Sequence, residues 1–146
     1  MGLITCLSVF VLDQLSKYLV VHFLALGHAK PLAPFFSLVH VRNHGVSFSL
    51  LSSYDMRWGL VVLASIIVLY IASLWKKSDH TWQRMAYGAI VGGALGNIID
   101  RTLRGSVVDF IYFHIGPYGY PAFNVADSAI VCGVLWLFWR QWNDQQ

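Results

Sequence analysis

The amino-acid sequence predicts an all-α membrane protein with four transmembrane helices and a small extracytoplasmic β-sheet cradle in the first outer loop. Composition is the first reason: 57% of the 146 residues are hydrophobic and 12% are charged, about half the charged share of an ordinary soluble domain. The second reason is the presence of about four apolar runs close to the roughly 20 residues that one membrane crossing needs. Because these runs use most of the chain, we expect a single integral membrane domain, residues 1–146.

The four expected spans are residues 2–24, 58–75, 85–104 and 123–139. The second span carries no charged side chain, which is typical of a scaffold helix in contact with lipid. The third span contains Gly88, Gly92 and Gly96 at four-residue intervals. Such a stripe of small residues lets another helix approach closely in a membrane.

The loops predict an orientation. The loop of residues 76–84 contains three Lys or Arg residues, and loops rich in Lys and Arg tend to stay in the cytoplasm. We therefore expect both chain termini in the cytoplasm and the loops of residues 25–57 and 105–122 on the outer side. The net charge is only +3 and the basic residues are scattered, so nucleic acid is not an expected partner.

The first outer loop contains the β-prone segment of residues 35–41. A turn-type sequence follows, Asn43-His44-Gly45, and then Val46-Ser47-Phe48. Aromatic and β-branched residues bounded by turn residues predict strands. We expect a small β-element lying on the membrane surface.

Charged side chains inside a span are costly unless they are paired or face a wet cavity, so each of them is a candidate functional residue. Asp13 and Lys17 are four residues apart on one face of the first span, in the order that favours an ion pair. We favour a structural ion pair over direct catalysis for these two residues.

A second polar group lies near the outer end of the third span, where four polar side chains share one helix face: Asn97, Asp100, Arg101 and Arg104. Two interpretations remain open. The group either clamps neighbouring helices together, with Arg104 reaching the surface, or it also holds a functional loop in place.

Two carboxyls flank the second outer loop. Asp109 lies between apolar residues, in Val107-Val108-Asp109-Phe110, a setting that raises the pKa of a carboxyl. Asp127 lies in the first turn of the fourth span, where Asn124 is placed to cap the helix. At similar membrane depth the two carboxyls can meet and share one proton, so that one activates water while the other protonates the scissile carbonyl oxygen. This pattern predicts aspartic-protease chemistry.

Other catalytic devices are less well supported. No pair of His residues with an acidic residue has zinc-binding spacing. A Ser-Lys hydrolase needs a neutral Lys17, whereas Asp13 one turn away favours the charged form. No glycine-rich phosphate loop is present. We expect no metal and no cofactor.

Five sequence blocks, in order along the chain, resemble those of lipoprotein signal peptidase, also called signal peptidase II, a family of bacterial membrane aspartyl proteases. They are Asp13-Gln14-Leu15-Ser16-Lys17, Arg42-Asn43-His44-Gly45-Val46-Ser47-Phe48, Gly92-Gly93-Ala94-Leu95-Gly96-Asn97-Ile98-Ile99-Asp100-Arg101, Gly105-Ser106-Val107-Val108-Asp109-Phe110 and Phe123-Asn124-Val125-Ala126-Asp127-Ser128. The resemblance covers essentially the whole chain. One departure is Val46-Ser47, where the family usually has two alanines.

The resemblance implies a function and a place for it. The family removes the signal peptide of prolipoproteins by cleaving N-terminal to a diacylglyceryl cysteine, in the bacterial cytoplasmic (inner) membrane, with the active site at the extracytoplasmic face. It implies prolipoproteins and membrane lipid as partners, and neither metal nor cofactor. Asp109 and Asp127 are then the catalytic pair. The residues that bind substrate or support the pair are Asn43, Gly45, Asn97, Arg101 and Asn124, and the structural polar network is Asp13, Lys17 and Asp100.

Two alternatives from other classes are weighed against this function. Buried Asp, Lys and Arg residues also form relays in a small proton-coupled transporter or channel, but no inverted repeat or pair of broken helices is evident in the sequence. A non-enzymatic membrane scaffold explains the glycine stripe, yet it leaves Asp109 and Asp127 without a role.

Overall fold

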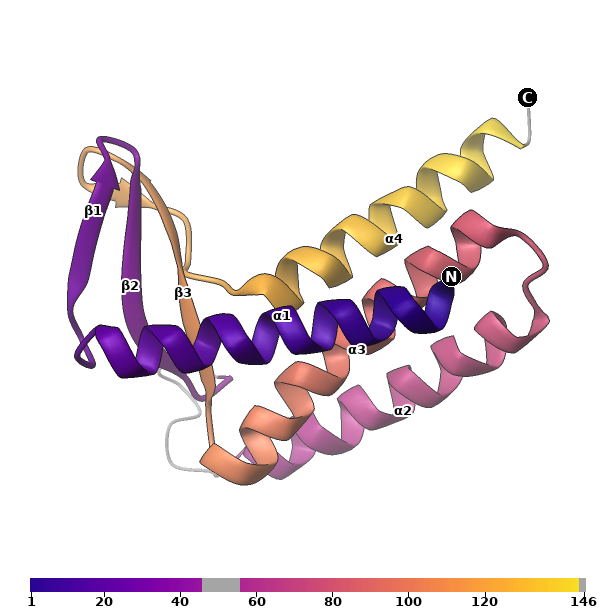
Figure 1. Cartoon of the computed structure of the whole chain (residues 1–146), viewed down its shortest axis with the longest axis horizontal. Helices are drawn as coiled ribbons and strands as arrows, with labels where there is room; N and C mark the ends of the chain where they lie inside the picture. Colours follow the sequence, from indigo (N-terminus) through magenta and orange to yellow (C-terminus); the bar gives the residue numbers. More distant parts are fainter. Residues whose placement is uncertain (46–55, 145–146) are drawn as a thin grey trace.

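The computed structural model describes residues 1–45 and 56–144. The described part contains four long helices: α1 (Gly2–Phe23), α2 (Arg57–Lys77), α3 (Thr81–Arg104) and α4 (Val125–Asn143). A β-sheet lies at one end of the helices, and the connection between α2 and α3 lies at the other end, towards which both chain termini also point (Figure 1). Helix α3 is the central element, since α1, α2 and α4 all pack against it.

The glycine stripe of α3 allows α1 to approach closely, as the sequence predicts. A methyl group added at Gly88 would collide with the backbone of Gly2, and one added at Gly92 would collide with the backbone carbonyl of Cys6. One turn further, Gly96 leaves room for the carboxylate of Asp13. Close backbone contact increases dispersion attraction between helices where lipid supplies no hydrophobic driving force.

Two of the helices in the described part, α1 and α2, are long and apolar enough by themselves to cross a membrane. Helix α3 begins at Thr81, earlier than the expected start of its span at residue 85, and α4 begins at Val125. The most buried part of α3 includes Asn97 and Asp100 together with the small residues. The mean hydropathy of α3 is lower than that of α1 and α2, because α3 carries polar residues on the face that it turns towards the other helices.

The sheet has four antiparallel strands in the order β1-β2-β3-β4: β1 (Ala29–Ala33), β2 (Phe36–Asn43), β3 (Val107–Ile115) and β4 (Tyr118–Gly119). The predicted small sheet is present, but its placement in the loop of residues 25–57 is incomplete, because residues 105–122 supply β3 and β4. A strand edge left unpaired exposes its backbone N–H and C=O groups, and the edge of β2 is paired with β3. Residues 46–48, expected to follow the turn after β2, lie outside the described residues.

Strand pairing places the start of α4 beside β3. The backbone of Phe123 pairs with Ile111 in an isolated antiparallel bridge, with Ile111 N donating to Phe123 O at 2.8 Å. On the other side of β3, Val41 of β2 pairs with Asp109. The sheet therefore joins β2, β3 and the start of α4 at one end of the helices.

Candidate active site

Asp109 lies in β3 and is 1% exposed. Two side-chain amides donate hydrogen bonds to its carboxylate: Asn43 Nδ2 lies 2.9 Å from Oδ2, and Asn124 Nδ2 lies 2.7 Å from Oδ1. The amide of Asn43 is itself oriented by Gly45, whose backbone N–H donates to Asn43 Oδ1 at 2.8 Å. Gly45 has a φ of +84°, a left-handed conformation that side chains rarely adopt, and a Cβ there would also displace the end of the Leu60 side chain of α2, so the turn after β2 favours glycine.

Asp127 lies in the first turn of α4, where Asn124 is the N-cap residue, as the sequence predicts. The Asp127 backbone N–H donates to Asn124 Oδ1 at 2.9 Å, and Asn124 N donates to Asp127 Oδ2 at 3.3 Å. These reciprocal bonds form a capping box. From α3, Asn97 Nδ2 donates to Asp127 Oδ1 at 2.9 Å.

Burial raises the pKa of Asp109 to about 6, and the neighbouring charge of Asp127 raises it as well. The hydrogen bonds from Asn43 and Asn124 and the charge of Lys17 act in the opposite direction, because they stabilise the ionised form. A carboxyl with this pKa exchanges its proton near neutral pH. The charge of Asp127 therefore acts on the carboxyl of Asp109; that the two form a catalytic pair stays a prediction.

Arg101 of α3 contributes positive charge to the site. Its guanidinium interacts electrostatically with Asp127, Asp109 and Asp100. Within residues 1–45 and 56–144, the buried Arg101 Nε has no hydrogen-bond partner. A buried donor without a partner is costly, so the group is suited to a ligand that brings an acceptor.

A buried ionic network lies next to the carboxyl pair. Lys17 Nζ lies 2.7 Å from Asp13 Oδ2, 2.8 Å from Asp100 Oδ2 and 3.0 Å from Asn97 Oδ1. Lys17, Asp13 and Asp100 are each at most 1% exposed. The expected pairing of Asp13 with Lys17 is therefore present, and Asp100 joins it. Asn97 connects this network to Asp127, because its Oδ1 accepts from Lys17 while its Nδ2 donates to Asp127.

Asp13 also reaches the fourth helix. Its Oδ1 accepts the backbone N–H of Ala126 at 2.9 Å. The first turn of a helix has backbone N–H groups without partners inside the helix, and a carboxylate from α1 satisfies one of them here. Asp13 thus ties α1 to the turn that carries Asp127.

Gln14 is a member of the network that sequence reasoning missed. Its Nε2 donates to Asp13 Oδ2 at 3.2 Å and to the Gly96 carbonyl at 3.3 Å. Arg104 is exposed, as expected, and it also pairs with Asp100 and donates to Gln14 Oε1 at 3.4 Å. The available signal was the position of Gln14 next to Asp13, on the helix face that meets α3.

Among the residues that the structure describes, no group of three His, Cys, Asp or Glu side chains is placed to hold a metal ion. The expectations of no metal and no cofactor stay predictions. The chemistry available from the described side chains is proton transfer by the two carboxyls and hydrogen bonding by the three asparagines around them.

The fold is that of a bacterial membrane enzyme. A solved bacterial membrane enzyme, determined in meso at 2.3 Å resolution, has a TM-score of 0.87 and 29% sequence identity, and the match covers 99% of this chain and 89% of that one. A second such structure, determined at 1.9 Å resolution, has the same TM-score and identity and covers 96% of this chain and 91% of that one.

Sequence comparison narrows the class to one family. The family model of Signal peptidase (SPase) II matches residues 5–143. The lipoprotein signal peptidase of Azoarcus sp. strain BH72 is 43% identical over 144 residues, which are 95% of this chain and 81% of the relative. That of Bartonella henselae is 43% identical over 138 residues, 92% of this chain and 82% of the relative. The chain belongs to the signal peptidase II family, whose members are proteases. Nothing in these comparisons favours a transporter or channel.

Proposed function

We propose that this protein is an aspartic endopeptidase that removes the signal peptide from diacylglyceryl-modified prolipoproteins, with Asp109 and Asp127 as its catalytic pair. One observation carries the proposal: the single carboxamide of Asn124 contacts both members of the pair, donating to Asp109 Oδ1 and accepting the backbone N–H of Asp127. One asparagine thereby fixes the relative position of two carboxyls that come from different elements of the fold.

The chemistry follows from one proton held by the pair. Two close carboxyls do not both ionise cheaply, so they titrate together, and the proton belongs to the pair. The ionised carboxyl removes a proton from water, whose oxygen attacks the scissile carbonyl carbon, while the protonated carboxyl donates to the carbonyl oxygen. Collapse of the tetrahedral intermediate breaks the C–N bond and returns a proton to the leaving amine. Arg101, whose Nε has no hydrogen-bond partner among the residues that the structure describes, is suited to bind a substrate carbonyl oxygen.

The proposal includes a membrane arrangement. All four helices span the bacterial cytoplasmic membrane, both termini are cytoplasmic, and the carboxyl pair lies at the extracytoplasmic face. Lys76 and Lys77 at the end of α2 and Arg84 in the first turn of α3 support this orientation, because α2 and α3 connect at the end of the helices away from the sheet (Figure 1). Cysteine labelling of residues 78–80 with a membrane-impermeant reagent should fail in intact cells, and efficient labelling there would reverse the orientation.

The substrate class follows from the family and from the location of the site. The related proteins are named lipoprotein signal peptidases, and a diacylglyceryl cysteine keeps its acyl chains in the membrane. A carboxyl pair at the end of a bundle of apolar helices meets such a cysteine at the depth where the lipid chains hold it. We propose cleavage on the N-terminal side of that cysteine, with no metal and no cofactor.

The test uses purified protein in detergent and a diacylglyceryl prolipoprotein. Wild-type protein should release the signal peptide, whereas Asp109→Asn and Asp127→Asn should each be inactive while staying folded, because an amide keeps the shape but does not exchange the proton. General acid and base catalysis contribute about 10²- to 10⁴-fold each. Asp144→Asn is the matched control, since Asp144 is an exposed aspartate at the far end of α4. Cleavage by folded Asn variants at near wild-type rates would exclude the aspartic mechanism.

A further inference from the structure

We propose that the protein binds the headgroup of an anionic phospholipid in a cavity at the end of the helices away from the sheet. The inference goes beyond the proposed function, because it rests on α2 crossing the membrane and does not depend on the carboxyl pair. The cavity measures about 380 Å³ and lies where α1, α2 and α3 meet. Residues of all three helices line it, among them Gly2, Leu3, Ala72, Trp75, Lys76 and Arg84.

Two cationic side chains line this cavity from different helices. Lys76 is in the last turn of α2, and Arg84 is in the first turn of α3. In residues 1–45 and 56–144, neither side chain has an ion pair or a hydrogen bond. Asp79, in the connection between α2 and α3, is exposed and does not line the cavity. An anion held between the two cations replaces their mutual repulsion by two charge-assisted contacts.

The cavity lies at the depth of lipid headgroups. Residues 58–75 of α2 carry no charged side chain, and Lys76 follows Arg57 by nineteen residues. At roughly 1.5 Å per helical residue this separation is about 28 Å, close to the roughly 30 Å thickness of the hydrocarbon core. Trp75 precedes Lys76, and indoles favour the membrane interface. When α2 crosses the membrane, Lys76 is therefore level with the phosphates of one leaflet.

Apolar groups lie next to the two cations. Ala72 is one helical turn nearer the membrane centre than Lys76, and Leu3 of α1 is 64% exposed. The indole of Trp75 lies against α1, since a Cβ added at Gly2 would be 2.8 Å from the indole Nε1. Cations at the membrane surface with apolar groups below them match the order of phosphate and acyl chains in a phospholipid. Basic pockets between membrane helices bind such headgroups, whereas a free phosphate ion needs no apolar surface.

The charge of the cavity also excludes other occupants. The segment that precedes the apolar region of a signal peptide is positively charged, so Lys76 and Arg84 repel it. A zwitterionic headgroup such as phosphocholine brings a cation of its own, which the two side chains also repel. A phospholipid with a net negative headgroup is the occupant that satisfies both the cations and the apolar groups.

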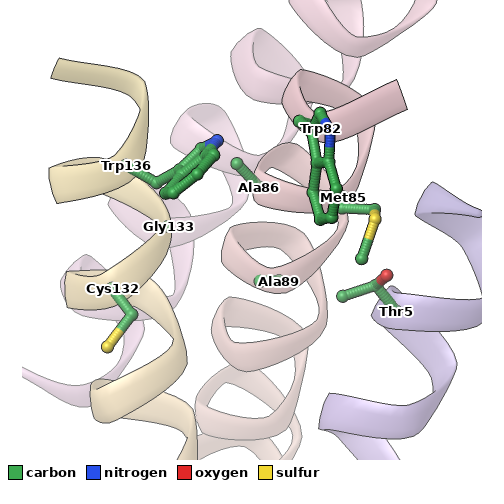
Figure 2. A pocket seen from close by; sticks show the side chains of 8 residues that line it. All are labelled: Thr5, Trp82, Met85, Ala86, Ala89, Cys132, Gly133 and Trp136. Atoms are coloured by element: carbon green, nitrogen blue, oxygen red, sulfur yellow. The ribbon is translucent and has the colours of Figure 1, made fainter. Parts of the chain in front are cut away.

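A second cavity, of about 270 Å³, provides a comparison because it lacks these cations. It lies between α1, α3 and α4, and Figure 2 shows Trp82, Met85 and Ala89 of α3 around it. Of the described residues, the eight that line this cavity carry no charge. It has an apolar surface without a group that pairs with a phosphate, so it serves as the control cavity.

Lipid binding to the purified protein in a non-ionic detergent tests the proposal, with native mass spectrometry as the readout. Dioleoylphosphatidylglycerol should bind at least roughly tenfold more tightly than dioleoylphosphatidylcholine, since each basic group near a membrane surface contributes about fivefold. Lys76→Gln and Arg84→Gln should each weaken phosphatidylglycerol binding about 10- to 100-fold, the contribution of one hydrogen bond to a charged group. Lys77→Gln is the matched control, because Lys77 is exposed beside Lys76 but does not line the cavity. It should leave the affinity nearly unchanged.

Three outcomes overturn the inference. Equal losses of affinity in Lys76→Gln and Lys77→Gln would show a diffuse attraction between a basic surface and anionic lipid rather than a site. Equal affinity of the wild type for phosphatidylglycerol and phosphatidylcholine would show that the headgroup charge is not recognised. Displacement of bound phosphatidylglycerol by inorganic phosphate at the same concentration would identify a site for a free ion.

Filling the cavity tests its shape without changing any charge. Ala72→Phe adds a ring to the proposed site, and Ala89→Phe adds the same ring to the control cavity in Figure 2. Both alanines are half-buried. Ala72→Phe should abolish the preference for phosphatidylglycerol over phosphatidylcholine, whereas Ala89→Phe should keep it. A preference that survives in Ala72→Phe contradicts the location of the site.

Thermal unfolding gives a second readout, because a ligand that binds only the folded protein stabilises it. Each tenfold increase of phosphatidylglycerol above its Kd should raise the unfolding temperature of the wild type by about 3–6 °C. The rise should be absent from the double variant Lys76→Gln/Arg84→Gln and present in Lys77→Gln, and an undiminished rise in the double variant overturns the inference. A wild-type protein that binds phosphatidylglycerol in this way but cleaves no prolipoprotein instead refutes the proposed function, so the two failures are distinguishable.

Discussion

The carboxamide of Asn124 lies 2.7 Å from the carboxylate of Asp109, with Nδ2 donating to Oδ1. Asn124 is fully buried, so the hydrogen bond is shielded from water. The same side chain caps α4. One residue therefore combines a structural task at the helix start with an electrostatic task at the carboxyl pair, and the two tasks are separable by mutation.

Asn124→Ser should preserve the cap and remove the donor. Serine is as good an N-cap as asparagine, but its hydroxyl is too short to reach Asp109 as the carboxamide does. A hydrogen bond to a charged group contributes about 1.5–3 kcal/mol, so kcat/KM should fall about 10- to 100-fold. Asn124→Ala should show the same loss of activity and an additional loss of about 1 kcal/mol in unfolding free energy. Equal stability of the Ser and Ala variants would contradict the capping role, and full activity of the Ser variant would contradict the role of the donor.

The pH dependence of cleavage should respond to Asn43. Burial first, and the charge of Asp127 second, raise the pKa of Asp109 to about 6, while the hydrogen bond from Asn43 lowers it. A donor stabilises the ionised form, so removing it favours the protonated form. In Asn43→Ala the alkaline limb of the kcat/KM profile should move to higher pH, by about one unit, since one unit corresponds to about 1.4 kcal/mol. Ser37→Ala is the control on the same strand, because Ser37 contacts His114 and not the pair. A shift in the control, or a shift to lower pH in Asn43→Ala, would contradict this assignment.

The sequence alone predicts those site features that depend on residues close together in the chain. Asn124 and Asp127 are recognisable because an N-cap and a carboxylate in the first turn are three residues apart. Asp13 and Lys17 are recognisable because a separation of four places them on one helix face. The glycine stripe predicts close packing from its spacing alone.

Features that depend on distant pairing were missed. Strand β3 pairs with β2 across more than 60 residues, and no local pattern specifies which loop provides the partner. The hydrogen bond from the Ala126 backbone to Asp13 joins residues 113 positions apart, and the bonds of Gln14 reach α3. These contacts form only once the helices pack, so residue spacing along the chain does not reveal them.

Lys17 should support stability rather than chemistry. Its ammonium group lies between the carboxylates of Asp13 and Asp100, all of them at most 1% exposed. Removing one partner from a buried ionic group leaves uncompensated charge and costs about 3–5 kcal/mol. Lys17→Met should therefore lower the unfolding temperature strongly, and the loss of activity should follow the loss of folded protein. Lys77→Met removes an exposed lysine and is the control. A Lys17→Met protein that is fully folded yet inactive would show that Lys17 acts in the reaction.

The contact between α1 and α3 is open to a test in which helix propensity and packing act in opposite directions. A methyl group at Gly92 would collide with the backbone carbonyl of Cys6, whereas a methyl group at Gly59 of α2 meets nothing within 4 Å. Both glycines are inside helices, where alanine is intrinsically favoured by about 1 kcal/mol. Gly59→Ala should thus be neutral or stabilising. Gly92→Ala should be destabilised by about 1–3 kcal/mol, because overpacking forces α1 away from α3. Thermal unfolding of the two variants in one detergent measures the difference.

The displacement of α1 also moves Asp13 relative to Ala126, so Gly92→Ala should lose cleavage activity below its unfolding temperature, while Gly59→Ala should keep it. If both variants unfold at the same temperature as the wild type, the glycine stripe is not what holds these two helices together.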